Sequence, residues 1–211
     1  LDKKTKTYIG LLLFIILSLF YIETNKPKKI NWFPSYAAKH KIPYGTYILR
    51  NEMSTLFNKN RIIDVYKSPY LFLKDSTTSG NYFFVDNNLN FGKEEFNELL
   101  KFVEKGNNVF ISTNGANIEY LNSKTKNYNS TEFEEVFYHQ IKNRNLNNEE
   151  YYFDRDFDKL YFSKIDTANT TVLGELIVKN KKDSIISTFP NFIKTKHGKG
   201  SFYLHTFPKA F

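Results

Sequence analysis

The chain contains no cysteine, and this absence excludes three kinds of chemistry. Disulfide bonds, thiolate nucleophiles and thiolate metal sites all require that side chain. Familiar catalytic motifs are missing as well, because the sequence has no Gly-x-Ser-x-Gly elbow, no phosphate-binding loop and no Gly-x-Gly-x-x-Gly segment. We therefore assign no catalytic residue from the sequence.

Histidines are few and scattered. They lie at His40, His139, His197 and His205, without the His-x-x-x-His spacing that presents two imidazoles on one helix face for metal binding. We expect these side chains to be surface histidines, and we expect no metal site and no cofactor.

Acidic residues are outnumbered, with 22 Asp and Glu against 30 Lys and Arg, which gives a net charge of +8. A nucleic-acid footprint requires basic residues that cluster on one face, whereas most lysines here are dispersed. The one dense group, Lys26, Lys28 and Lys29, adjoins an apolar segment, where basic residues contact lipid headgroups. We expect no nucleic-acid partner. A hydrophobic content of 41% indicates a chain that can bury a core.

A long uncharged run near the N-terminus follows Lys3, Lys4 and Lys6. As a helix it would span roughly 22 Å, and flanking threonines and snorkelling lysines can extend it across a bilayer. No small-x-small pattern follows, which favours a retained anchor over a cleaved signal peptide, and a buried core helix is the third interpretation. The predicted anchor, which contacts membrane lipid, comprises Tyr8, Ile9, Gly10, Leu11, Leu12, Leu13, Phe14, Ile15, Ile16, Leu17, Ser18, Leu19, Phe20, Tyr21 and Ile22.

This anchor divides the chain into a basic tail (1–7), a transmembrane segment (8–22), a linker (23–40) and one domain (41–211). Three lysines precede the anchor and three follow it, so the positive-inside rule is nearly balanced. We expect a single-pass protein with its domain outside the cytoplasm.

The fold class follows from residues 82–111. Continuous apolar runs at 82–85 and 109–111 are typical of strands buried on both faces. Between them Glu94 and Glu95 suit a helix N-terminus and Gly106 suits a helix stop. The apolar face of this helix is formed by Phe96, Leu99, Leu100 and Val103. Strand, helix and strand form a βαβ unit with parallel strands, which predicts an α/β domain with a partly parallel sheet flanked by helices.

Ligands in such sheets bind beyond the carboxyl ends of the strands, which fall in two polar loops. The alternative is ordinary turn chemistry, because Asn, Asp and Gly are common in any connection. The candidate ligand-binding residues are Asp86, Asn87, Asn88, Ser112, Thr113, Asn114 and Gly115.

The remaining elements are predicted from periodicity. We expect a helix from Thr46 to about residue 58, a strand at 61–66, and a polar, peripheral insertion at about 119–150. In this insertion Thr131 and Glu134 form a capping box ahead of a helix containing Val136, Phe137 and Ile141. Strands are then predicted at 160–165, 172–178, 185–189, 192–196 and 201–206, the last two joined as an antiparallel hairpin at 197–200.

Several stretches resemble a bacterial family known as domain of unknown function 4350, particularly its Bacteroidetes members. The resemblance rests on residues 31–36, 42–46, 82–87 and 106–112, and runs from the anchor to the hairpin. It implies an amidotransferase-like (flavodoxin-like) fold on a protein anchored in the bacterial cytoplasmic membrane, and members of the family often lie beside genes for MoxR-type ATPases and other membrane proteins. Catalytic amidotransferases use a cysteine nucleophile, so a glutaminase reaction is excluded here. Family members continue beyond residues 205–211, which implies that the chain is a fragment.

Three hypotheses follow. The first is a non-catalytic binding or accessory module of a membrane-associated complex, with a protein partner. The second is a hydrolase or carbohydrate-active enzyme that uses the two polar loops. The third, nucleic-acid binding, requires a contiguous basic face. The sequence favours the first.

Overall fold

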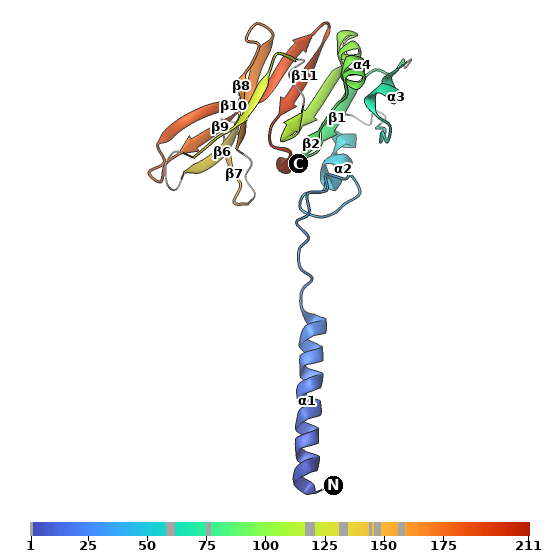
Figure 1. Cartoon of the computed structure of the whole chain (residues 1–211), viewed down its shortest axis with the longest axis vertical. Coiled ribbons are helices and arrows are strands. Elements are labelled where there is room, and N and C mark those ends of the chain that lie inside the picture. Colours follow the sequence, from blue (N-terminus) through green and yellow to red (C-terminus); the bar gives the residue numbers. More distant parts are fainter. Residues whose placement is uncertain are drawn as a thin grey trace. The chain divides into compact units, whose positions relative to one another are not determined.

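The computed structural model describes residues 2–57, 62–74, 77–116, 121–130, 135–143, 145, 149–155 and 159–211. The chain forms two compact units, Leu1–Phe33 and Pro34–Phe211 (Figure 1).

The first unit contains the helix α1, Lys3–Asn25, none of whose residues is buried. At 23 residues it is roughly 35 Å long, which exceeds the ~30 Å hydrocarbon layer. Its terminal hydroxyls bond to backbone carbonyls of the same helix, as Thr7 Oγ1 does to Lys3 O at 3.1 Å and Thr24 Oγ1 to Phe20 O at 3.0 Å. Among the described residues, this is the one helix long and apolar enough to cross a membrane, a property that signal sequences share. The predicted apolar helix is thus confirmed.

The second unit is built on a seven-stranded sheet with the order β1-β3-β11-β10-β9-β6-β7. Strands β1 (Asn81–Val85), β3 (Asn108–Ser112) and β11 (Gly200–His205) pair in parallel. The other pairings are antiparallel, and they involve β10 (Ile185–His197), β9 (Thr170–Lys179), β6 (Val136–Ile141) and β7 (Glu150–Tyr152). The domain is therefore mixed α/β, and the predicted partly parallel sheet is confirmed, although most of the sheet is antiparallel.

The predicted βαβ unit consists of β1, the helix α4 (Lys93–Glu104) and β3, with Asn81 opposite Asn108 in the parallel register. Helix α4 begins where the Glu95 carboxylate accepts a hydrogen bond from the Gly92 N–H at 2.8 Å, a capping interaction at the positive end of the helix. It ends before Gly106, whose φ of +107° suits a residue without a Cβ. Phe102 of this helix is buried, whereas Leu100 is only half-buried. The fully buried face of α4 therefore contains Phe102 in place of the predicted Leu100.

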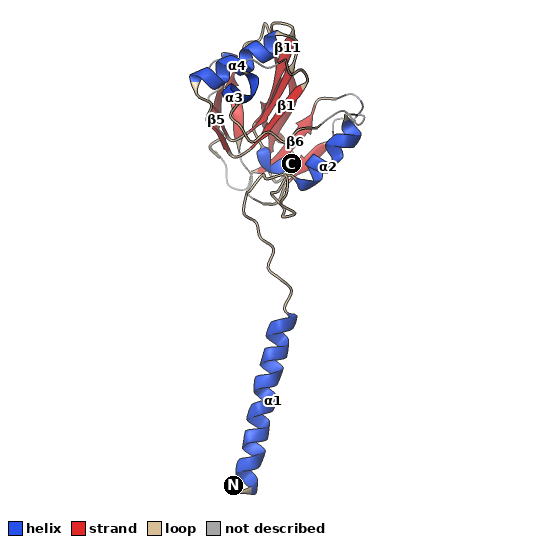
Figure 2. Ribbon diagram, turned by 90° about the vertical axis from the view of Figure 1, so that its right-hand side faces the viewer, coloured by secondary structure: helices blue, strands red, loops and turns tan. Residues whose placement is uncertain are grey.

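The main core lies between one face of the sheet and helix α4 (Figure 2). Phe96 of α4 stacks on Phe202 of β11, with ring centroids 5.9 Å apart and an interplanar angle of 7°. Both rings are fully buried, and burial of such a side chain contributes roughly 1.5–3 kcal/mol. Helix α3 (Pro69–Leu73) packs against α4 and adds Leu73 to this core.

A strand was predicted for residues 61–66, but residues 62–66 form no strand, so the prediction was wrong for them. Residue 61 lies outside the described residues. Ile63 and Tyr66 are 48% and 94% exposed. Asp64 instead forms an ion pair with Arg50 of helix α2 (Tyr47–Leu56), at 2.6 Å between Arg50 Nε and Asp64 Oδ1. Helix α2 itself confirms the helix predicted after Thr46.

The predicted helix at residues 136–141 was also wrong, because this segment is strand β6 and pairs with β9 inside the main sheet. Burial alternates along it, with Phe137 and His139 buried, as a strand of period two requires. The predicted capping residues, Thr131 and Glu134, lie outside the described residues. Within the predicted insertion, the described strand Val136–Ile141 therefore belongs to the main sheet, so the expectation of a peripheral segment was wrong for these residues.

Strands β8 (Leu160–Lys164) and β9 confirm two further predictions, and β8 pairs with β5 (Lys124–Asn127) in a small second sheet. The two strands predicted at 185–189 and 192–196 are one strand, β10, with a register shift between Pro190 and Phe192. A proline cannot donate to the ladder, so a bulge accommodates it. The predicted hairpin joins β10 to β11, with Gly198 at φ +57°.

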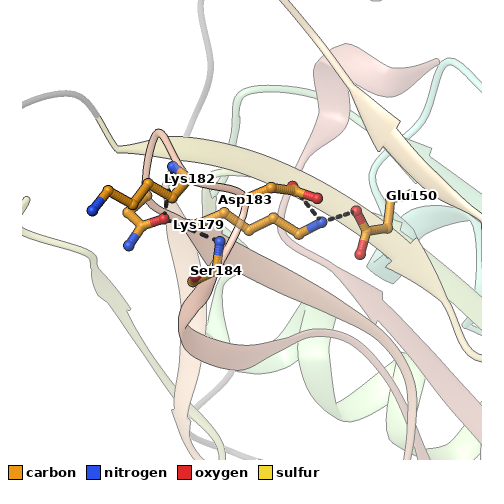
Figure 3. A network of polar contacts seen from close by, with 6 residues as sticks. Glu150, Lys179, Lys182, Asp183 and Ser184 are labelled. Atoms are coloured by element: carbon orange, nitrogen blue, oxygen red, sulfur yellow. Dashed lines mark hydrogen bonds and ion pairs between the residues drawn. The ribbon is translucent and has the colours of Figure 1, made fainter.

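An ion-pair network holds the turn between β9 and β10 against edge strand β7 (Figure 3). Lys179 Nζ donates to Glu150 Oε2 at 2.6 Å and to Asp183 Oδ1 at 3.0 Å. These hydrogen bonds raise the pKa of the Lys179 ammonium. In the same turn the Asn180 side-chain oxygen accepts from the backbone N–H groups of Lys182 and Ser184. The short edge strand is therefore tied to the sheet by charge as well as by backbone pairing.

Candidate functional site

The two predicted loops meet at the carboxyl edge of the parallel strands. Because Val85 lies opposite Ser112 in the β1–β3 register, the residues after each strand are neighbours. The Asp86 N–H donates to Ser112 O at 3.1 Å, and the Asn114 N–H donates to Asn87 O at 3.1 Å. The structure thus brings residues 86–88 and 112–115 together.

The polar side chains of these loops largely bind one another. Asn87 accepts at its side-chain oxygen from Tyr36 OH at 2.6 Å and from Asn114 Nδ2 at 3.3 Å. The Thr113 hydroxyl donates to Asn87 O at 3.2 Å. This closed network uses groups that a ligand would otherwise contact, and it is typical of turn chemistry.

The seven candidate residues differ in accessibility. Ser112 and Thr113 are 0% and 6% exposed. Asn87, Asn114 and Gly115 are half-buried, whereas the side chains of Asp86 and Asn88 are exposed. Residues Asn88–Leu89 (β2) and Gly115–Ala116 (β4) pair as a two-stranded parallel sheet, which extends the contact between the loops. Of these seven residues, Asp86 and Asn88 are therefore the most accessible to an outside ligand.

His205 lies in β11 directly opposite Ser112 of β3. Its Nδ1 is 2.9 Å from Ser112 Oγ, and the tautomer decides which atom donates. Burial lowers the pKa of His205 to about 4, so the imidazole is neutral at neutral pH. A serine beside a neutral imidazole is the pair used for nucleophile activation. The Ser112 side chain, however, is fully buried, so an outside substrate has no direct access to its hydroxyl.

A second histidine occupies the same face of the sheet. His139 of β6 is 7% exposed, stacks on Phe207 with ring centroids 4.5 Å apart, and lies 6.4 Å from the ring of His205. Burial, and then the charge of His205, lower the pKa of His139 to about 3. Its Nδ1 is also hydrogen-bonded to the side-chain amide of Asn191. The expectation of surface histidines was therefore wrong for the buried His139 and for the half-buried His205 and His197, whereas His40 is exposed.

Sequence reasoning missed this histidine pair for an identifiable reason. His139 lies in a segment whose apolar spacing also fits a helix, so its position on a sheet face was hidden. In β11 the buried residues Phe202 and Leu204 point toward the main core. Because successive side chains of a strand point to opposite faces, this alternation was the signal that could have placed His205 on the other face.

A small recess adjoins the carboxyl edge between the main sheet and the β5–β8 sheet. Its volume is about 10 Å³, close to the least space that holds one water molecule, whereas small-molecule pockets have roughly 300–1,000 Å³. The recess therefore has no room for a substrate. It is lined by Ile111, Thr113, Thr125, Leu160, Phe162, Leu204, His205 and Thr206. Within the described ranges, no group of three or more His, Asp or Glu side chains is placed to hold a metal ion.

Comparison with protein-family models and with curated proteins found no match. Among solved structures, the chain is similar to a catalytic mutant of the GH42 β-galactosidase Gan42B from G. stearothermophilus, with 14% identity, a TM-score of 0.36 and 55% of this chain covered. It is also similar to the exo-β-1,4-mannosidase Op5Man5 from Opitutaceae bacterium strain TAV5, with 11% identity, a TM-score of 0.34 and 59% of this chain covered. The matches span 17% and 21% of those longer chains. Similarity of this extent identifies neither a shared fold nor a shared activity.

Proposed function

We propose that this chain is a membrane-anchored binding or accessory module of a membrane-associated complex. In this proposal α1 is retained as a single-pass anchor in the bacterial cytoplasmic membrane, and the α/β domain lies outside the cytoplasm. The domain is an amidotransferase-like shell of the family named above, without the nucleophile that its catalytic counterparts use. Its partner is a membrane protein or a MoxR-type ATPase system.

One observation carries the non-catalytic part of the proposal. At the carboxyl edge, where α/β domains usually bind ligands, the loop side chains of Asn87, Thr113 and Asn114 bond to each other and to the backbone. The adjoining recess of about 10 Å³ has too little space for a substrate. An edge organised in this way supports a structural role better than a reaction.

The partner is tested by affinity capture of the full chain from detergent-solubilised membranes of its own organism. The control replaces α1 by an unrelated spanning helix of equal length, so that a protein recovered with both forms is bound through the domain. We expect a membrane protein or ATPase to be recovered in near-equal amounts. Recovery of neither above background would reject the proposal.

A second candidate function is a hydrolase or carbohydrate-active enzyme that uses the same loops. The observation in its favour is the contact between Ser112 Oγ and His205 Nδ1, and the observation against it is the burial of Ser112. A serine-directed fluorophosphonate probe separates the two functions. We expect no labelling of the native domain, whereas labelling that disappears in Ser112→Ala would establish an accessible nucleophile and favour the enzyme.

A further inference from the structure

The segment Lys26–Phe33, which completes the first unit, has an unusual combination of side chains. Helix α1 ends at Asn25, and Lys26 is its C-cap with an extended backbone (φ −60°, ψ 132°). Pro27 follows and cannot continue the helix. The chain therefore leaves the end of the apolar helix as a strip that is neither helix nor strand, with the sequence Lys-Pro-Lys-Lys-Ile-Asn-Trp-Phe.

Large apolar side chains are exposed on this strip. Ile30 is 63% exposed, Trp32 is 38% exposed and Phe33 is 65% exposed. The Asn31 side chain accepts a hydrogen bond from the Phe33 N–H at 3.0 Å, which fixes the local turn at the two aromatic residues. A flexible linker in water is composed mainly of small or polar residues, so this composition points to a partly apolar environment.

The strip also carries positive charge next to its apolar side chains. Lys28 and Lys29 are exposed and immediately precede the apolar residues. Tryptophan and tyrosine concentrate at the boundary between lipid and water, and Tyr21, in the last turns of α1, is 70% exposed. Lysines beside a spanning helix contribute about 1 kcal/mol each to binding at an anionic lipid surface. Aromatic and basic residues thus meet at one end of one membrane-compatible helix.

We propose that Lys26–Phe33 is an interfacial segment that binds an anionic lipid surface. Lys28 and Lys29 contact lipid phosphates, while Ile30, Trp32 and Phe33 lie at the boundary between headgroups and acyl chains. This proposal rests on the proposed retention of α1 as a membrane anchor. It goes beyond that proposal by naming the class of lipid that is bound and the residues that contact it. It predicts that the segment does not serve as a freely moving linker.

The chain supplies its own probe, because Trp32 is its only tryptophan. The purified full chain is reconstituted into vesicles of phosphatidylcholine, with or without phosphatidylglycerol, in which a fraction of the lipids carries bromine on the acyl chains. Bromine quenches an indole that lies near it. We expect Trp32 emission to be blue-shifted and quenched by brominated lipids, most strongly where phosphatidylglycerol is present. Emission that responds to aqueous iodide but not to brominated lipid would overturn the proposal.

A matched pair of variants tests the lysines. Removing both charges in Lys28→Gln/Lys29→Gln should weaken the surface-bound state roughly 30-fold and reduce the quenching in phosphatidylglycerol vesicles. The control Lys3→Gln/Lys4→Gln removes the same charge before α1 and should leave Trp32 quenching unchanged. Equal quenching in all three proteins would reject the role of Lys28 and Lys29.

Alkaline carbonate extraction of the same vesicles measures the anchor independently. A chain that stays in the vesicles while Trp32 is unquenched would reject only the interfacial segment. A chain that is extracted would reject membrane anchoring, and with it both proposals. Absence of a captured protein partner affects neither readout.

Discussion

Ser112 and His205 are 93 positions apart in the chain, yet Ser112 Oγ lies 2.9 Å from His205 Nδ1. The parallel register of β3 and β11 places them opposite one another at the last residue of each strand. This hydrogen bond joins the two neighbouring strands beyond their backbone ladder. It also provides a buried polar contact whose loss can be measured.

The substitution Ser112→Ala should lower the free energy of unfolding by about 1–2 kcal/mol, because it deprives the His205 imidazole of its hydroxyl partner. Urea denaturation of the domain measures this change. Ser163→Ala is the control, since Ser163 is exposed and its hydroxyl bonds to Lys124 O at 3.3 Å; its effect should stay within about 0.5 kcal/mol. Equal effects of the two substitutions would contradict the importance of the buried bond.

Stability should fall as the pH is lowered from about 6.5 to about 4. An unfolded histidine takes up a proton near pH 6.5, whereas the folded-state pKa values of His205 and His139 are about 4 and about 3. In that window the unfolded state binds more protons, so acid favours unfolding, by roughly 3 kcal/mol for His205 alone. Denaturation midpoints measured across this range test the sign.

The variant His205→Gln should remove the His205 contribution to this pH dependence, because glutamine does not titrate, while the contribution of His139 remains. His40→Gln serves as the control, since His40 is exposed, and it should leave the pH profile unchanged. A profile that is identical in the native chain and in His205→Gln would show that this half-buried histidine does not control acid stability.

Gly200 is a position where a side chain has no space. A Cβ atom there would lie 2.0 Å from Asn107 O and 2.5 Å from Val103 O, both of which are backbone atoms. We expect Gly200→Ala to destabilise the domain by roughly 1–3 kcal/mol or more, measured by thermal unfolding. Gly92→Ala is the matched control, because its Cβ would make an ordinary contact at 3.5 Å with Glu95 Oε2. A larger loss from Gly92→Ala would contradict the described backbone contact.

Lys179 should stabilise the edge of the sheet more than an ordinary surface lysine does. Lys179→Met removes a cation that bonds to both Glu150 and Asp183 and leaves two carboxylates without it. Lys101→Met removes only an exposed partner of Glu98, and such pairs contribute little. We expect a lower thermal midpoint and faster hydrogen exchange in β7 for Lys179→Met alone. Equal midpoints for both variants would contradict this role.

The sequence predicted those elements whose signals are local. Helix α4 has acidic residues in its first turn, a left-handed glycine at Gly106 and an apolar face, so capping and periodicity agree. The two polar loops were also placed at one edge, because the βαβ connection requires parallel strands. That these loops bind a ligand stays a prediction.

The sequence failed where pairing over long distances decides the structure. Val136, Phe137 and Ile141 fit helical spacing, but the segment pairs with β9, which begins at Thr170. Tertiary context overrides local propensity in such cases. The meeting of His139 and His205 depends on the order of strands in the sheet, which no single segment reveals.

The position of β11 has a consequence for how the domain folds. Among the described strands β11 is the latest in sequence, yet it lies between β3 and β10 and is the strand through which the two parts of the sheet connect. During synthesis β1 and β3 emerge first and must wait, with an unpaired edge, until Gly200–His205 arrives. Folding of this kind is slow because its decisive contacts are non-local, and partly formed sheets expose edges that aggregate. The nascent domain is therefore an expected substrate for chaperones until its sheet is complete.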